Sequence, residues 1–127
     1  MAHVIVADAN EGRRSLLGNT LEREGFQVTR VSNLRQAVGT TVATTPEVLL
    51  LEETWPQGDA LEAAQAVVSN PSVGARTRVL LLSRDTSQEG MVNAARSGIA
   101  EVLSKPIDMS RLIAQVRAHA EKRTVAP

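Results

Sequence analysis

The chain has 127 residues, of which 43% are apolar, and its 14 basic and 14 acidic residues cancel. This length and apolar share predict one domain with an ordinary hydrophobic core. The sequence has no cysteine, which excludes disulfides and thiolate metal sites, and a neutral chain without a basic run argues against nucleic-acid binding. No stretch approaches the ~20 apolar residues of a membrane span, and no export signal is visible, so a cytoplasmic protein without membrane contact is expected.

The first part of the chain is expected to form two strands around a helix. Residues 3–8 (HVIVAD) are predicted to be a buried strand that ends in a carboxylate. Asn10 suits the N-cap of a helix that runs to Glu24, and Gly25 suits the position that ends it. The predicted inner face of this helix carries Leu16, Leu17 and Leu21. Residues 26–31 (FQVTRV) alternate, which predicts a shorter strand near an edge of the sheet.

The centre of the chain is an unbroken apolar run within residues 46–52 (PEVLLLE). Such a run is typical of a strand covered on both faces, as in a parallel sheet flanked by helices. A helix capped by Ser32 or Asn33 is expected before it, and a helix capped by Asp59 after it. The residues expected to face inward are Leu34, Ala37, Val38 and Val42 in the first helix and Leu61, Ala64, Val67 and Val68 in the second. Residues 70–75 (NPSVGA) predict a turn-rich connection.

The last part of the chain repeats the order of strand and helix twice. Residues 78–83 (RVLLLS) and 101–104 (EVLS) are predicted strands. Ser87 is expected to cap a helix through Arg96, and Asp108 is expected to cap the last helix through residue 122. The expected inward residues are Met91, Val92 and Ala95 in the former and Leu112, Ile113 and Val116 in the latter. Residues 123–127 (RTVAP) have no pattern and are expected to be a tail or the start of a linker.

Five strand–helix pairs in succession predict an α/β fold, with a doubly wound five-stranded parallel sheet in a single domain over residues 1–122. Four of the predicted strands finish in a polar residue. These residues are Asp8, Glu52, Ser83 and Lys105. Because the carboxyl ends of parallel strands meet at one edge, these side chains are expected to form a small polar pocket, at the place where open α/β sheets bind ligands. The neighbouring Glu53 is expected to face solvent.

Several segments resemble the receiver domain of bacterial response regulators. They are VIVADANEGRRSLLGNTLEREGFQV, PEVLLLEETWPQGDALE, RVLLLS and LSKP, which together cover most of the chain. The resemblance implies a flavodoxin-like receiver fold with strand order 2-1-3-4-5 and five helices. It also implies that Asp8 matches the first acid of a magnesium-binding pair, that Ser83 matches the switch hydroxyl, and that Lys105 matches the lysine that contacts the phosphoryl group.

The sequence departs from the family pattern at four positions. Glu52 stands in place of the phosphoacceptor Asp, and its extra methylene displaces the carboxylate by ~1.5 Å. Ala9 replaces the second acid of the pair. Arg84 follows the switch hydroxyl, where it is expected to cover the pocket and pair with Glu52 or Asp8. Val102 replaces the aromatic residue that rotates on activation.

These departures predict that Mg²⁺ binds weakly or not at all, with Asp8 and Glu52 as the remaining candidate ligands, because Mg²⁺ demands near-ideal octahedral oxygen geometry. No other cofactor is expected. Two hypotheses remain open for Glu52. It is either an inert carboxylate paired with Lys105 or a partial imitation of a phosphorylated Asp, with one charge where an acyl phosphate has nearly two.

The main functional hypothesis is an atypical receiver that binds proteins without a phosphorylation cycle and is not an enzyme. In the family, partners and second copies bind to the face formed by the fourth helix, the fifth strand and the last helix. That face would include Met91, Arg96, Val102, Arg111, Gln115 and Arg117. The alternative is a phosphoacceptor receiver served by a histidine kinase, as the N-terminal part of a longer regulator. A flavin, cobalamin or dinucleotide domain on the same topology is a third class, but the loop after the first strand lacks the motifs for all three.

Overall fold

The computed structural model describes residues 1–122, and its core is a five-stranded, all-parallel sheet in the order β2-β1-β3-β4-β5. The strands are β1 (His3–Ala7), β2 (Gln27–Val31), β3 (Val48–Glu52), β4 (Arg78–Ser83) and β5 (Glu101–Ser104). The predicted sheet and its strand order are therefore confirmed. The predicted tail or linker, residues 123–127, lies outside the described residues.

Six helices cover the sheet in the described part of the chain, so the expectation of five was wrong. They are α1 (Glu11–Arg23), α2 (Leu34–Thr44), α3 (Ala60–Val68), α4 (Pro71–Gly74), α5 (Gln88–Arg96) and α6 (Met109–Lys122). The additional helix, α4, is a single turn where a turn-rich connection was predicted. The Asn70 carboxamide oxygen accepts a hydrogen bond from the Ser72 amide at its start, and the buried side chain of Val73 anchors it.

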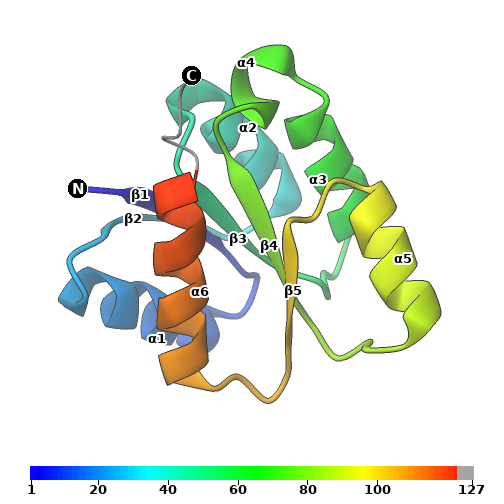
Figure 1. The fold of residues 1–127 in the computed structure, drawn as a ribbon. Coiled ribbons are helices and arrows are strands. Elements are labelled where there is room, and N and C mark those ends of the chain that lie inside the picture. The colour runs from blue at the N-terminus through cyan, green and yellow to red at the C-terminus, as the bar shows by residue number, and fades with distance from the viewer. Residues whose placement is uncertain (123–127) are drawn as a thin grey trace.

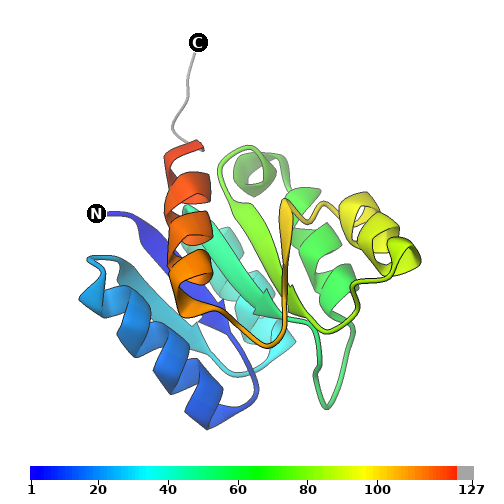
Figure 2. The ribbon, with the colours of Figure 1, turned by 60° about the horizontal axis from the view of Figure 1, so that its bottom comes forward.

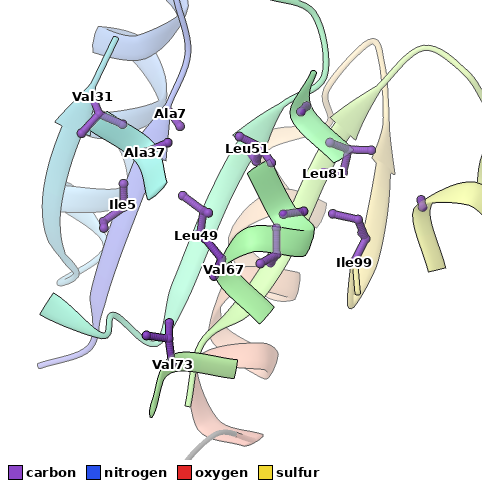
Figure 3. Packing of buried hydrophobic residues seen from close by; sticks show 14 residues of the cluster. Ile5, Ala7, Val31, Ala37, Leu49, Leu51, Val67, Val73, Leu81 and Ile99 are labelled. Carbon is purple, nitrogen blue, oxygen red and sulfur yellow. The ribbon is translucent and has the colours of Figure 1, made fainter. Parts of the chain in front are cut away.

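The helices lie on both faces of the sheet and seal two separate cores. Figure 1 shows α1 and α6 on one side of the sheet and α2, α3 and α5 on the other. Along β3, successive residues enter opposite cores: Leu49 and Leu51 join the cluster under α2, α3 and α5, which Figure 3 shows, and Val48 and Leu50 join the one under α1 and α6. This alternation explains why the strand has no polar position before its last residue.

The inward faces of three helices differ from the sequence-based prediction. Leu16 of α1 is 54% exposed, although Leu17 and Leu21 are buried as predicted. In α2, Thr41 is buried instead of Val42. The largest difference is in α5, where Ala94 is buried while the residues expected inward, Met91, Val92 and Ala95, are exposed. The α5 helix therefore presents an apolar surface to solvent.

Side-chain caps fix where the helices begin, and they place the loops that leave the strands. The Asn10 side chain accepts from the Arg13 amide at 2.9 Å, Asp59 from the Leu61 amide at 2.8 Å and Ser87 from the Gly90 amide at 3.1 Å. For α2 the cap is Asn33, one of the two residues predicted. In Figure 2 the loops that follow the carboxyl ends of the strands are turned toward the viewer, and the candidate site lies among them.

Candidate functional site

Glu52 is the last residue of β3, and its side chain is 1% exposed. One carboxylate oxygen, Oε1, forms an ion pair with Lys105 Nζ, whose side chain is 15% exposed. The other, Oε2, accepts the backbone N–H of Thr54 at 2.7 Å. The indole N–H of Trp55 also donates to the Glu52 carbonyl oxygen at 2.5 Å. Both oxygens of this buried carboxylate are thus engaged by groups of the chain itself.

Asp8 follows β1 directly and is fully buried. Arg13, in the first turn of α1, donates from Nε to Oδ2 at 2.9 Å and from a terminal nitrogen to Oδ1 at 3.1 Å. Oδ1 also accepts the Asn10 amide at 2.8 Å. The hydrogen bonds to Asp8 raise the pKa of the Arg13 guanidinium above its ordinary value, so its charge is permanent. Asp8 therefore forms a bidentate ion pair with Arg13.

Ser83 ends β4 and is buried, and its hydroxyl bridges two loops. Its Oγ donates to Glu53 Oε2 at 2.8 Å and accepts the Asp85 amide at 2.9 Å. The prediction that Glu53 faces solvent was wrong. In the structure Glu53 is half-buried, and its own amide donates to the Leu82 carbonyl at 3.0 Å. The Ser83 hydroxyl is therefore already bonded to an acidic residue of the neighbouring loop.

The structure brings together Asp8, Glu52, Ser83 and Lys105 at one edge of the sheet, in the order that the topology dictates. A hollow of about 200 Å³ opens beside them between α1 and the loop after β5. Arg13, Glu52 and Lys105 line its polar part. Its apolar part is lined by Leu16, Leu17, Leu82, Ile107 and Met109.

Arg84 does not cover the pocket as the sequence suggested. Its side chain is exposed, and the ion pairs of Asp8 and Glu52 within residues 1–122 go to Arg13 and Lys105. Arg13 was missed because a position in the first turns of an amphipathic helix predicts contact with water. Its reach back to the preceding strand end depends on the tight turn at Asn10, which the spacing of five residues from Asp8 allowed but did not require.

Most residues of the expected partner face lie on α5, β5 and the start of α6, but Arg117 does not join them. Val102 is partly buried against the core under α2, α3 and α5. Met91 and Arg96 are exposed on α5, and Arg111 of α6 lies 3.8 Å from Glu101 of β5. Arg117 departs from this face. It pairs with Glu24 at 3.0 Å and lies over the Phe26 ring at 5.2 Å, next to the end of α1.

The residues present do not fit a bound Mg²⁺ ion. An octahedral ion needs open oxygen donors, yet Asp8 is held by Arg13, Glu52 by Lys105, and the neighbouring Ala9 has no oxygen in its side chain. In the part of the chain that the structure describes, no three acidic or histidine side chains are grouped around one point. The Asp8 and Glu52 carboxylates are therefore already paired with the chain's own cations.

Comparison with known proteins agrees with this architecture. The family model for the response regulator receiver domain matches residues 4–117. A receiver domain of a signal transduction histidine kinase from Syntrophus aciditrophicus shares the fold with a TM-score of 0.89 at 19% identity, and the match covers 100% of this chain and 96% of that one. The chain belongs to the response regulator receiver domain family.

Two curated relatives differ in length. The probable transcriptional regulatory protein y4xI of Sinorhizobium fredii is 30% identical over 121 residues, which are 95% of this chain but only 50% of that protein. The chemotaxis protein CheY of Bacillus subtilis is 24% identical over 115 residues, which are 89% of this chain and 93% of CheY. The chain thus spans half of one relative and nearly all of the other. Within residues 1–122, no helix is both long and apolar enough to cross a bilayer.

Proposed function

We propose that this chain is an atypical receiver, a cytoplasmic signalling module that binds a protein partner without a phosphorylation cycle. The observation that carries the proposal is the ion pair between Glu52 and Lys105 at the phosphoacceptor position. A carboxylate that already holds the lysine and a backbone amide has both oxygens engaged. To attack a phosphodonor, this buried carboxylate would first have to give up these bonds.

The pairing of Asp8 with Arg13 supports the same proposal. In phosphoryl transfer, catalysis rests mainly on positioning and on cations that neutralise the developing charge. Here each of the two buried carboxylates already faces a cation of the chain. Mg²⁺ would have to displace a guanidinium that makes two hydrogen bonds to Asp8, and Ala9 offers it no compensating ligand.

The test is incubation with acetyl phosphate and Mg²⁺ followed by intact mass measurement. We expect no phosphoryl adduct on the native chain, whereas a receiver with Asp at the acceptor position, run beside it, gains one. Glu52→Gln is the matched control because it keeps the size of the side chain and removes the nucleophilic charge. A phosphoryl adduct on the native chain that is absent from Glu52→Gln would show that the chain is a working phosphoacceptor.

The proposed partner surface is the exposed side of α5 with its neighbours on β5 and α6. Met91 and Val92 are 43% and 41% exposed, and Arg96 lies on the same helix. Apolar side chains with an arginine beside them are the composition that protein interfaces favour. We expect Met91→Glu with Val92→Glu to abolish binding of a protein partner or of a second copy, measured by light scattering or titration calorimetry, without changing the far-UV circular dichroism.

A further inference from the structure

The hydroxyl of Ser83 lies at the start of a continuous series of hydrogen bonds that ends in α5. Ser83 Oγ accepts the Asp85 amide at 2.9 Å. Asp85 Oδ1 accepts both the amide and the hydroxyl of Ser87, at 3.0 and 2.6 Å. Ser87 Oγ in turn accepts the Gly90 amide in the first turn of α5, at 3.1 Å. Glu53 is the other partner of Ser83, so the loop after β3 is connected through these residues to α5.

We propose that Glu53 is a positioning residue that fixes the start of α5 through this series, called here the Glu53–Gly90 relay (Glu53, Ser83, Asp85, Ser87 and Gly90). The inference rests on the proposed function, because α5 carries the surface assigned there to a partner. Glu52 holds Lys105 and Glu53 holds Ser83. Two adjacent carboxylates thereby divide between them the lysine and the hydroxyl at this edge of the sheet.

The burial of Ser83 explains why Glu53 has this effect. A buried hydroxyl must place its one proton on an acceptor, and Ser83 is 1% exposed. With Glu53 accepting that proton, the oxygen lone pairs are left directed toward the Asp85 amide. The bond to an ionised acceptor is also stronger than one between neutral groups. Removing the Glu53 carboxylate therefore lets the Ser83 hydroxyl rotate and weakens the hydrogen bond from the Asp85 amide to Ser83 Oγ.

The far end of the relay has few other constraints. Ala94 is the buried residue of α5 as the structure describes it, one helical turn beyond Gly90. A Cβ atom at Gly90 would lie 2.4 Å from Asp85 Oδ2, so the start of the helix is packed directly on that carboxylate. The hydrogen bonds from Ser87 also lower the pKa of Asp85, which keeps this acceptor ionised in mildly acidic solution. The position of the first turn of α5 thus depends on Asp85.

The experiment is amide hydrogen exchange, measured by NMR without any phosphodonor, on the native chain and on Glu53→Ala, Glu53→Gln and Glu62→Ala. Glu62 is an exposed glutamate and serves as the matched control. We expect Glu53→Ala to speed exchange about tenfold at Asp85, and by a smaller factor at Ser87 and Gly90. Glu53→Gln retains an acceptor oxygen and is expected to restore slow exchange, and Glu62→Ala is expected to match the native chain.

Two further readouts separate the relay from a general loss of stability. Amides of the central strand β3 are expected to exchange at the native rate. At the amides of the relay, the double variant Ser83→Ala with Glu53→Ala should exchange only slightly faster than the faster single variant, because both substitutions remove the same hydrogen bond. Native exchange at Ser87 and Gly90 in Glu53→Ala, or uniform acceleration throughout the sheet, would overturn the inference. The phosphodonor test is independent of this one, since an adduct on Glu52 would refute the proposed function and leave the relay intact.

Discussion

Glu52 and Lys105 form an ion pair that is largely withdrawn from water. Removing charges from water is costly, and their mutual attraction offsets that cost only while both are present. A buried pair of this kind is therefore a poor source of net stability but a sensitive point for mutation. Replacing either Glu52 or Lys105 alone is therefore expected to lower the stability of the protein.

We expect Lys105→Met to lower the free energy of unfolding by ~3 kcal/mol, because it leaves the Glu52 carboxylate buried without a cation. Combining it with Glu52→Gln should recover most of this loss. Urea denaturation measures both. Arg111→Met is the matched control, since it breaks a 3.8 Å pair with an exposed arginine and should cost below ~0.5 kcal/mol. Equal losses in Lys105→Met and Arg111→Met would contradict the account of the buried pair.

Trp55 reports on this pocket, because its indole N–H donates to the Glu52 carbonyl oxygen. We expect its fluorescence to change little when millimolar Mg²⁺ is added to the native chain, since Arg13 holds Asp8 and Lys105 holds Glu52. Arg13→Ala removes the guanidinium from both Asp8 oxygens and is expected to respond more strongly. A saturating change in the native chain, equal to that of Arg13→Ala, would show that the guanidinium does not block the ion.

At the scale of elements, the strands were predictable and the faces of the helices only partly so. β3 and β4 carry unbroken apolar runs, whose short length favours a strand covered on both sides over a buried helix. In α5 the apolar residues at 91, 92, 94 and 95 fit more than one helix face, since successive residues are turned by about 100°. Packing against the sheet decides between them, and it selects the small side chain of Ala94.

The same holds for the candidate site: its residues could be predicted from the sequence, but their hydrogen-bond partners could not. Asp8, Glu52, Ser83 and Lys105 were predictable because each lies at the end of a strand or directly after it, and the topology alone brings strand ends together. The contact between Glu53 and Ser83 joins residues 30 positions apart, at the points where two strands give way to loops. Loop geometry has no period in the sequence, so neither this bond nor the reach of Arg13 was foreseen.

The observed face of α5 leads to a direct test. Val92→Thr is expected to change the free energy of unfolding by less than ~0.5 kcal/mol, because Val92 is 41% exposed. Ala94→Leu adds volume where the side chain is 1% exposed and should cost ~1–3 kcal/mol through overpacking. Thermal denaturation of both variants compares them. A larger loss in Val92→Thr than in Ala94→Leu would favour the face predicted from the sequence.

For the whole molecule, the opposite edge of the sheet holds a histidine whose pKa is lowered by burial. His3 begins β1, and its Nε2 lies 2.8 Å from the Thr29 hydroxyl on β2. Burial lowers the pKa of His3 below its ordinary value of 6.5, against the opposing effect of the Glu47 carboxylate. The folded protein therefore resists a proton that the unfolded chain accepts.

The lowered pKa of His3 determines in which direction the free energy of unfolding changes with pH. Above pH 6.5 both states are neutral at His3 and the contribution is fully present. As pH falls from 6.5 through the lowered pKa of the folded state, the unfolded chain binds the proton first and the free energy of unfolding declines. Urea denaturation of the native chain and of His3→Asn, between about pH 5 and about pH 7.5, isolates the contribution of His3 to the free energy of unfolding. If that free energy falls with pH no more steeply in the native chain than in His3→Asn, the prediction is wrong.

The two internal ion pairs also shape how this pocket can change over generations. Replacing Glu52 by the shorter Asp would draw the carboxylate away from Lys105, while Arg13 would still occupy Asp8. Under the proposed function, this single replacement costs a buried contact and leaves Asp8 paired with Arg13. Building a phosphoacceptor into this pocket would then take several replacements together, because giving up one partner of a buried ion pair alone costs stability.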